Sequence, residues 1–360
     1  MIFRRPKPAL TLHIGLGKTG TTVLQEFFWE NRKLLEKNGI TYPDYGVVAG
    51  AHHLLSPHIP PYLKNAWNFK PAEEWAPKLA RSRAAQTLLS SELISSGQSD
   101  VITQFCTAVC ERFKLRIVVY LRRQDHLIMA SYNQHVKTGK QRRKLSEIYQ
   151  NMVRRFDFEA TLKPWVDAIG TENIVVRPYE REQFYGNDIR LDFLYHAFGV
   201  EIDGELQLGG GNANPRLETS ALEYKRLLNN IVSDGEKLLR LQRLLTGYCE
   251  VREATSADKQ SLLPAAIRLE ILAGYEQQNN AIARTYLGRT DGKLFLEPPP
   301  NPGTTWQDNV LSPEEATSIA VFLAGKDPSL MQWLSAEVPK FVDSEQYGPR
   351  IAARFLAGTL

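Results

Sequence analysis

Cysteine is scarce in this chain, with three residues among 360, and long apolar runs are absent. Three cysteines are too few for the disulfide frameworks that stabilise small secreted domains. Cys106 and Cys110 lie four apart on a predicted helix, and no histidine close in the sequence completes a metal-ligand set, so we expect core packing. No stretch has the length of a membrane span or the apolar core of a signal peptide. We therefore expect a cytoplasmic protein with no transmembrane segment.

A strong excess of charge is also missing. The formal net charge is +4, from 44 Lys and Arg against 40 Asp and Glu. Such a mild excess does not predict a nucleic-acid partner. Apolar residues make up 43% of the chain and charged residues 23%, as in ordinary soluble globular proteins. The length is sufficient for the core of one large domain or of two modest ones.

The most informative stretch is LTLHIGLGKTGTT, which runs from Leu10 to Thr22. Its apolar first part, Leu10–Ile14, predicts a buried strand, and a glycine-rich turn leads from it into a helix that opens at Thr21. The first N–H groups of a helix have no partner within the helix, and the helix dipole favours negative charge there. Lys18 adds a positive charge, and three threonines add hydroxyl donors. We therefore expect a phosphate or sulfate site at this turn.

The spacing of the glycines indicates which nucleotide the turn suits. The triphosphate-binding P-loop has four residues between its first glycine and its Gly-Lys pair, whereas Leu16 alone separates Gly15 from Gly17. The pattern Gly15-x-Gly17-x-x-Gly20 does match the dinucleotide fingerprint, which also requires an acidic residue ending a second strand about 20 positions on. The stretch Gly39–Asp44 is a poor strand broken by proline. The lysine and threonines favour a charged phosphosulfate, with an NAD(P)-dependent oxidoreductase as the alternative.

Strands and helices alternate through the first half of the chain. Besides the Leu10–Ile14 strand, apolar runs predict strands at Gln86–Glu92, Leu115–Leu121 and Asn173–Arg177. Helical patterns cover residues 21–37, 71–83, 100–113, 124–136, 145–153, 158–169 and 189–198. This alternation predicts an α/β fold with a mainly parallel central sheet and helices on both faces.

The strongest linker signal is Gly209–Asn212, three glycines followed by asparagine. Beyond it the patterns are helical, at residues 218–230, 235–247, 264–285 and 313–324. We therefore expect a single domain with two parts, an α/β core with the nucleotide-binding motifs at residues 1–208 and a mostly helical C-terminal part at residues 209–360.

A second candidate anion site follows the Leu115–Leu121 strand. Arg122 and Arg123 come directly after this strand, and Ser131 lies on the helix behind them. In open α/β sheets ligands bind beyond the carboxyl ends of the strands, and guanidinium groups bind phosphate through paired donors. Two anion sites on one sheet edge indicate a nucleotide with anionic groups at both ends of its ribose.

With both sites considered, the sequence resembles the sulfotransferase family, which uses 3′-phosphoadenosine 5′-phosphosulfate (PAPS) as its sulfuryl donor. Residues 12–22 are similar to the family's 5′-phosphosulfate loop, and residues 118–125 with 131–134 are similar to its 3′-phosphate motif. The similarity is strong over residues 10–139 and has the character of bacterial, carbohydrate-type members. It implies a P-loop-NTPase-like fold and no metal. The cofactor-binding residues that it implies are Gly17, Lys18, Thr19, Gly20, Thr21, Thr22, Arg122 and Ser131.

One spacing departs from the family pattern. In the family the serine usually comes eight residues after the arginine that ends the strand, whereas Ser131 is the ninth residue after Arg122. One step along a helix turns a side chain by about 100°. Arg122 with Ser131 is the expected pair, and Arg123 is the alternative ligand.

The resemblance also implies catalytic roles. Lys18 would stabilise the bridging oxygen of the donor, while an acceptor hydroxyl needs a general base, which in this family is a histidine or a carboxylate. His53, with His52 beside it, lies in a loop that could face the cleft, and Glu92 ends a strand of the same sheet edge. His13 lies within the first strand, where we expect it to pack in the core. The predicted catalytic residues are therefore Lys18, His53 and Glu92.

The expected reaction is transfer of a sulfuryl group from PAPS to a hydroxyl or amine acceptor, with a glycan or glycolipid as the acceptor partner. A basic run that includes Lys137, Lys140 and Arg142 could contact an acidic acceptor. Two alternatives remain open. One is the oxidoreductase named above, and the other is a non-catalytic nucleotide-binding protein that would not need His53 or Glu92.

Overall fold

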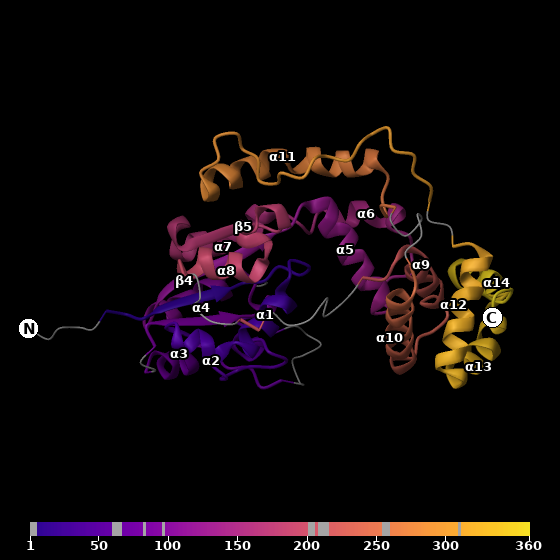
Figure 1. The fold of residues 1–360 in the computed structure, drawn as a ribbon, viewed down its shortest axis with the longest axis horizontal. Coiled ribbons are helices and arrows are strands. Elements are labelled where there is room, and N and C mark those ends of the chain that lie inside the picture. The colour runs from indigo at the N-terminus through magenta and orange to yellow at the C-terminus, as the bar shows by residue number, and fades with distance from the viewer. Residues whose placement is uncertain are drawn as a thin grey trace, which may run out of the picture. The chain divides into compact units, whose positions relative to one another are not determined.

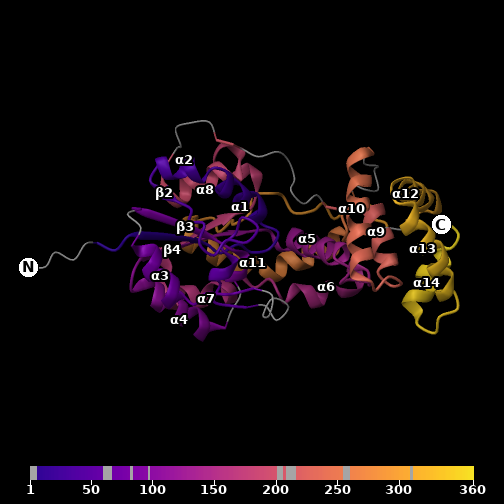
Figure 2. The same cartoon turned by 90° about the horizontal axis from the view of Figure 1, so that it is seen from below.

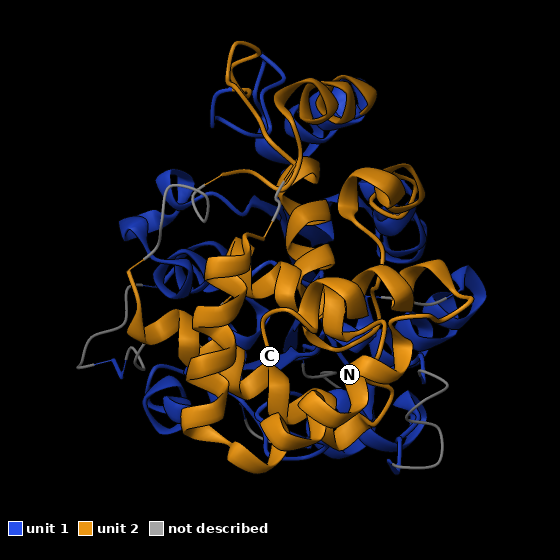
Figure 3. Ribbon diagram, turned by 90° about the vertical axis from the view of Figure 1, so that its right-hand side faces the viewer, with its two compact units in different colours: residues 1–123, 157–213, 275–298 blue, residues 124–156, 214–274, 299–360 orange. Residues whose placement is uncertain are grey.

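The computed structural model describes residues 6–59, 67–81, 84–95, 98–200, 206–207, 216–253, 260–308 and 311–360. The chain forms two compact units, each assembled from separate segments and coloured differently in Figure 3. The first unit comprises residues 1–123, 157–213 and 275–298, and the second comprises residues 124–156, 214–274 and 299–360. The expected linker at Gly209–Asn212, and with it the expected boundary after residue 208, lies outside the described residues.

A five-stranded sheet forms the centre of the first unit (Figure 1). Its strands are β1 (Ala9–His13), β2 (Ile40–Thr41), β3 (Gln86–Ser90), β4 (Lys114–Leu121) and β5 (Ile174–Pro178). They lie in the order β2-β3-β1-β4-β5, and every neighbouring pair is parallel. The predicted α/β fold with a mainly parallel sheet is confirmed.

The central strand β1 is buried by its neighbours and by the helices on both faces of the sheet. Leu12 lies opposite Leu89 on β3 and Ile117 on β4, and all three side chains are fully buried. Strands covered on both faces are apolar over most of their buried length, which explains why these strands appear in the sequence as apolar runs.

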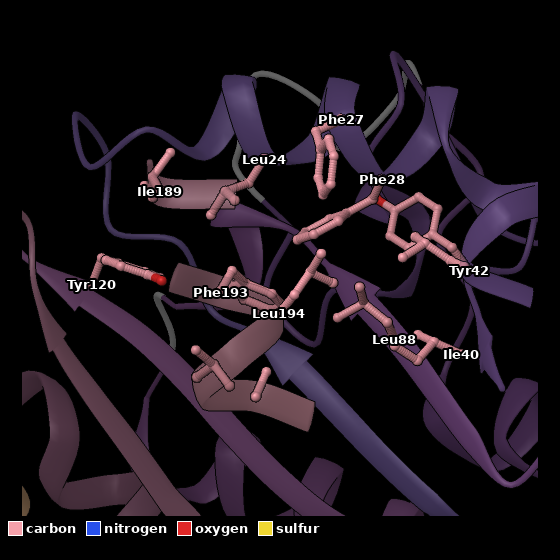
Figure 4. Close-up of a cluster of buried hydrophobic side chains, with 13 residues drawn as sticks. Leu24, Phe27, Phe28, Ile40, Tyr42, Leu88, Tyr120, Ile189, Phe193 and Leu194 are labelled. Carbon is pink, nitrogen blue, oxygen red and sulfur yellow. The ribbon is translucent and has the colours of Figure 1, made fainter. Parts of the chain in front are cut away.

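One face of the sheet is covered by α1 (Thr21–Glu30), α2 (Arg32–Lys37) and α8 (Ile189–Phe198) (Figure 2). The apolar residues of α1 and α8 meet side chains of β3 and β4 in a buried cluster, shown in Figure 4. Phe28 on α1 and Phe193 on α8 lie at the middle of it, with ring centroids 4.8 Å apart. This cluster anchors the first turn of α1, and hence the glycine-rich turn, against the sheet.

The prediction of one helix over residues 21–37 is wrong, because the helix breaks at Asn31. The side-chain amide of Asn31 donates to the carbonyl of Phe27, at 2.9 Å, and to that of Gln207, at 2.8 Å. Asparagine competes for backbone groups in this way, and its partner Gln207 is remote in the sequence. The break therefore depends on the contact between Asn31 and Gln207, which the spacing of apolar residues along the helix cannot predict.

The opposite face of the sheet is covered by α3 (Ala72–Ala80), α4 (Ser99–Cys110) and α7 (Phe158–Ile169) (Figure 2). Three large aromatic side chains, one from each helix, pack edge to face or tilted in this layer: Trp75, Phe105 and Trp165. Cys106 is buried here with a free thiol, as expected for a core residue. Helices therefore cover both faces of the sheet, as predicted.

The regular secondary structure of the second unit is helical in the residues that are described. It contains α5 (Gln124–Lys137), α6 (Leu145–Val153), α9 (Thr219–Leu228), α10 (Gly235–Val251), α12 (Pro313–Lys326), α13 (Pro328–Glu337), α14 (Tyr347–Leu356) and the first part of α11 (Ala265–Leu287). A buried ion pair joins two of them, since the Arg268 guanidinium on α11 lies 2.7 Å from the Asp125 carboxylate on α5. Within the described ranges, no helix combines the length and the apolar character that crossing a membrane requires.

Candidate active site

The carboxyl ends of the parallel strands place the predicted functional residues of the first unit along one edge of the sheet. The turn Gly15–Gly20 follows β1, Glu92 follows β3, and Arg122 follows β4. The chain leaves β1 toward the β2 side of the sheet and leaves β4 toward the β5 side. Neighbouring strands whose connections diverge in this way open the crevice in which α/β proteins bind ligands.

The turn after β1 has a strained, tightly packed backbone. Lys18 has φ of 71°, in the left-handed region that few residues other than glycine adopt, and Gly20 has φ of 77°. The Thr19 hydroxyl is buried and donates to the carbonyl of Leu16 at 2.5 Å, so it braces the turn. A β-carbon at Gly15 would lie 2.2 Å from Thr21 Cγ2, so only glycine fits there. Strain of this kind is retained where the rest of the structure enforces it, often at functional sites.

The first turn of α1 presents unpaired backbone donors. Gly20 is the N-cap and supplies no side-chain cap, and the first backbone bond runs from Leu24 N–H to the Gly20 carbonyl. Among the described residues, none accepts a hydrogen bond from the N–H groups of Thr21, Thr22 or Val23. Three unpaired N–H groups at a helix N-terminus form a ready site for an anion. These donors fit a phosphate or sulfate group.

Arg122 is held against this turn from the neighbouring strand. Its Nη1 donates to the carbonyl of Lys18 at 3.0 Å, and its guanidinium lies 5.4 Å from the centroid of the Tyr179 ring. Tyr179 follows β5 and was not predicted as a site residue. The side chain of Arg122 thereby brings a permanent positive charge next to the N-terminus of α1.

Arg123 points to different partners. Its side chain is 4% exposed, its Nη2 lies 3.1 Å from the Glu297 carboxylate, and its Nη1 donates to the carbonyls of Glu297 and Pro298 at 2.9 and 3.1 Å. These contacts give Arg123 a structural role and favour Arg122 as the ligand, although that role stays a prediction. Ser131 lies half-buried on α5 in the second unit, and its pairing with Arg122 likewise stays a prediction.

Three histidines lie around the end of β3, and two of them, His13 and His52, form buried hydrogen bonds with the surrounding chain. His13 is fully buried with its Nδ1 2.8 Å from the Ser90 hydroxyl, and burial lowers its pKa to about 3. His52 accepts the Ser90 N–H at Nδ1, at 3.2 Å, and donates from Nε2 to the carbonyl of Pro43, at 2.8 Å. Burial lowers the pKa of His52 to about 4. Both nitrogens of His52 are occupied, which leaves His53 as the histidine candidate for proton transfer.

The structure brings the two predicted base candidates together. His53 Nε2 lies 3.8 Å from Glu92 Oε1, and His53 Nδ1 lies 2.7 Å from the Ser91 hydroxyl. The side chain of His53 is 10% exposed and that of Glu92 is 36% exposed, so the carboxylate is the more accessible group. Burial lowers the pKa of His53, and the negative charge of Glu92 partly opposes that effect.

Glu92 also lies close to the glycine-rich turn and contacts α1. Its Oε2 accepts a hydrogen bond from the Gln25 amide at 2.7 Å, and a β-carbon at Gly15 would lie 3.5 Å from Glu92 Cβ. Sequence reasoning did not identify Gln25 or Ser91. The only available signals were that Gln25 lies one helical turn beyond the anion site and that Ser91 immediately precedes Glu92. The candidate anion site and the base candidates therefore lie close together within the first unit.

The strand order argues against the dinucleotide alternative. In the dinucleotide-binding fold the second strand of the chain lies beside the first, which brings the acidic residue at its end to the ribose. Here β3 lies between β1 and β2, and β2 is a two-residue edge strand. Asp44 therefore follows a strand that is not adjacent to β1, the strand that leads into the glycine-rich turn.

In the part of the chain that the structure describes, no three His, Cys, Asp or Glu side chains gather closely enough to hold a metal ion.

No protein-family model matches the sequence. A protein of Archaeoglobus fulgidus whose function is uncharacterised is 27% identical over 183 residues, which are 51% of this chain and 48% of that protein. The chain thus spans about half the length of this curated relative. The crystal structure of a sulfotransferase from Alicyclobacillus acidocaldarius aligns with 71% of this chain and all of its own, with 15% identity and a TM-score of 0.39.

Proposed function

We propose that this chain is a PAPS-dependent sulfotransferase. The observation that carries the proposal is the pairing of two anion-binding features on adjacent parallel strands. One feature is the set of unpaired N–H groups at the start of α1 with Lys18 beside them, and the other is Arg122 at the end of β4. A nucleotide with a 5′-phosphosulfate and a 3′-phosphate carries the two anionic groups that such a pair would bind.

The residues of the site fit this donor. When bound, PAPS supplies a sulfuryl group, which becomes bonded to the acceptor oxygen as the bond to the bridging phosphate oxygen breaks and adenosine 3′,5′-bisphosphate leaves. The N–H groups of Thr21, Thr22 and Val23 would hold the 5′ anion, and Lys18 would stabilise negative charge that builds on the bridging oxygen. Arg122 would bind the 3′-phosphate. Glu92 and His53, 3.8 Å apart, supply the proton-accepting group that a hydroxyl acceptor requires.

The proposed acceptor is the hydroxyl or amine of a glycan or glycolipid. Support for a carbohydrate comes from the resemblance of the two motifs to those of bacterial, carbohydrate-type sulfotransferases. Support for an acceptor that must lose a proton comes from the accessible carboxylate of Glu92 beside the proposed anion site.

A thermal-shift screen with adenosine 3′,5′-bisphosphate, NADH, NADPH and ATP with magnesium tests the proposal. A nucleotide at one hundred times its dissociation constant should stabilise the protein by about 2.7 kcal/mol, and we expect this for the bisphosphate. Stabilisation by NADPH with none by the bisphosphate would instead support the oxidoreductase.

Lys18→Ala tests the catalytic part of the proposal. The variant should lose turnover by a larger factor than it loses affinity for the donor, because the lysine charge is used mainly as the leaving oxygen becomes negative. Radiolabelled PAPS with a panel of glycans measures turnover, and calorimetric titration measures affinity. Full turnover with only weaker affinity would make Lys18 a binding residue.

A further inference from the structure

The Ser91 hydroxyl forms a hydrogen bond with one ring nitrogen of His53, Nδ1. Ser91 is fully buried at the end of β3, and its Oγ already accepts the backbone N–H of Leu93 at 3.2 Å. Its own proton needs an acceptor, because buried hydroxyl groups that do not donate are costly. Among the described residues, the one acceptor within reach of that proton is His53 Nδ1, at 2.7 Å. Ser91 therefore donates to Nδ1.

An imidazole that accepts at Nδ1 carries its proton at Nε2 when neutral. The Trp67 ring stacks on the His53 ring, with centroids 5.5 Å apart and planes inclined by 16°, which restrains rotation of the imidazole. His53 Nε2 is the nitrogen that faces Glu92 Oε1. In this tautomer His53 offers Glu92 an N–H donor and has no lone pair on that side with which to accept a proton.

Glu92 has one oxygen left for chemistry. Its Oε2 accepts from Gln25, so Oε1 is the oxygen directed to the His53 side. The separation of 3.8 Å between Nε2 and Oε1 is longer than a hydrogen bond. A hydroxyl oxygen to one side of the line that joins the two atoms, at about 2.8 Å from each, could accept from Nε2–H and donate its proton to Oε1.

We propose that Ser91 is a positioning residue that holds His53 as the Nε2–H tautomer, so that Glu92 is the general base and His53 orients the acceptor hydroxyl as a donor. The second half of this proposal rests on the proposed function. In the transfer, the acceptor oxygen forms its bond to sulfur, its proton passes to Glu92 Oε1, and the electrons of the broken sulfur–oxygen bond leave with adenosine 3′,5′-bisphosphate.

Nuclear magnetic resonance on the free protein tests the tautomer without any nucleotide. Long-range correlation of ring protons with ¹⁵N distinguishes protonated from unprotonated imidazole nitrogens, and a His53→Gln variant identifies the signals of His53. We expect Nε2 to be protonated and Nδ1 unprotonated above neutral pH. Ser91→Ala should give a mixture of tautomers, while Ser91→Thr, which keeps the hydroxyl, should retain the single one. A protonated Nδ1 in the unsubstituted protein would overturn the proposal.

The activity of two variants tests the assignment of the base. Glutamine at position 53 keeps an N–H donor but cannot accept a proton, so His53→Gln should lower kcat by about tenfold or less. Glu92→Gln should lower kcat by about 10²- to 10⁴-fold, the usual contribution of a general base. The reverse order of losses would overturn the assignment. A protein that binds the bisphosphate but transfers no sulfuryl group would refute the proposed function, and the resonance experiment would still decide the role of Ser91.

Discussion

Lys18 carries both the charge proposed for catalysis and a strained backbone, and these two properties can be separated by substitution. With φ of 71°, Lys18 occupies the left-handed region, which costs a residue other than glycine about 1–2 kcal/mol. Lys18→Gly removes this cost but adds about 0.5–1 kcal/mol of unfolded-state entropy, the usual penalty of glycine relative to alanine. Lys18→Ala keeps the backbone strain. The glycine variant should therefore be more stable than the alanine variant by up to about 1.5 kcal/mol.

Denaturant unfolding of both variants, followed by circular dichroism, measures the difference as a shift in midpoint at constant slope. Both variants lack the ammonium group, so both should lose sulfuryl transfer equally, and Lys18→Arg, which keeps a positive charge, is the matched control. A glycine variant that is less stable than the alanine variant would show that the left-handed conformation of Lys18 is not what strains the turn.

Two further predictions concern acid stability and the glycines of the turn. Burial places the folded-state pKa values of His13 and His52 at about 3 and about 4, below their unfolded value of 6.5. The unfolded chain therefore binds more protons, and stability that is complete above pH 6.5 should fall on acidification, by up to about 1.4 kcal/mol per pH unit for each histidine. Unfolding midpoints between pH 7.5 and pH 5 measure this fall, and a flat profile would contradict the buried neutral state. Gly20→Ala should destabilise the protein by about 2–4 kcal/mol, because it adds left-handed strain and its β-carbon would lie 2.8 Å from Ile189 Cδ1. Gly17→Ala, whose β-carbon would meet nothing within 4 Å, should leave stability unchanged, and equal losses in the two variants would refute this account of the turn.

The strands β1, β3, β4 and β5 could be predicted because each contains a buried apolar run, as parallel strands covered on both faces require. The two-residue edge strand β2 was not predicted, since it lies in the stretch Gly39–Asp44, which the proline made a poor strand in the sequence. The break of the first helix at Asn31 could not be predicted, since it depends on the contact with Gln207. The helices α13 and α14 were not predicted. For α13 a local signal existed, because Asp327 caps the helix through the Leu330 N–H and Pro328 takes its first position.

The residue types of the candidate site could be predicted from strand ends and turn chemistry, but their individual roles could not. His52 and His53 are adjacent in the sequence, and what separates them is their contacts with Ser90 and Ser91, 38 residues away. Glu92 was expected at the sheet edge. Its hydrogen bond with Gln25 depends on how α1 is oriented against the sheet, which the sequence did not predict. Tertiary contacts, not composition or spacing, decide which of these side chains can move a proton.

The central claim, that Arg122 and the glycine-rich turn bind the two ends of a 3′,5′-phosphorylated nucleotide, is tested most directly by a four-way calorimetric titration. Wild-type protein and Arg122→Ala are each titrated with adenosine 3′,5′-bisphosphate and with adenosine 5′-monophosphate. A charge-assisted contact to phosphate is worth about 1.5–3 kcal/mol, so the variant should bind the bisphosphate about 10- to 150-fold more weakly and the monophosphate nearly as well as the wild type. Equal losses for both nucleotides, or no binding of the bisphosphate by the wild type, would contradict the account.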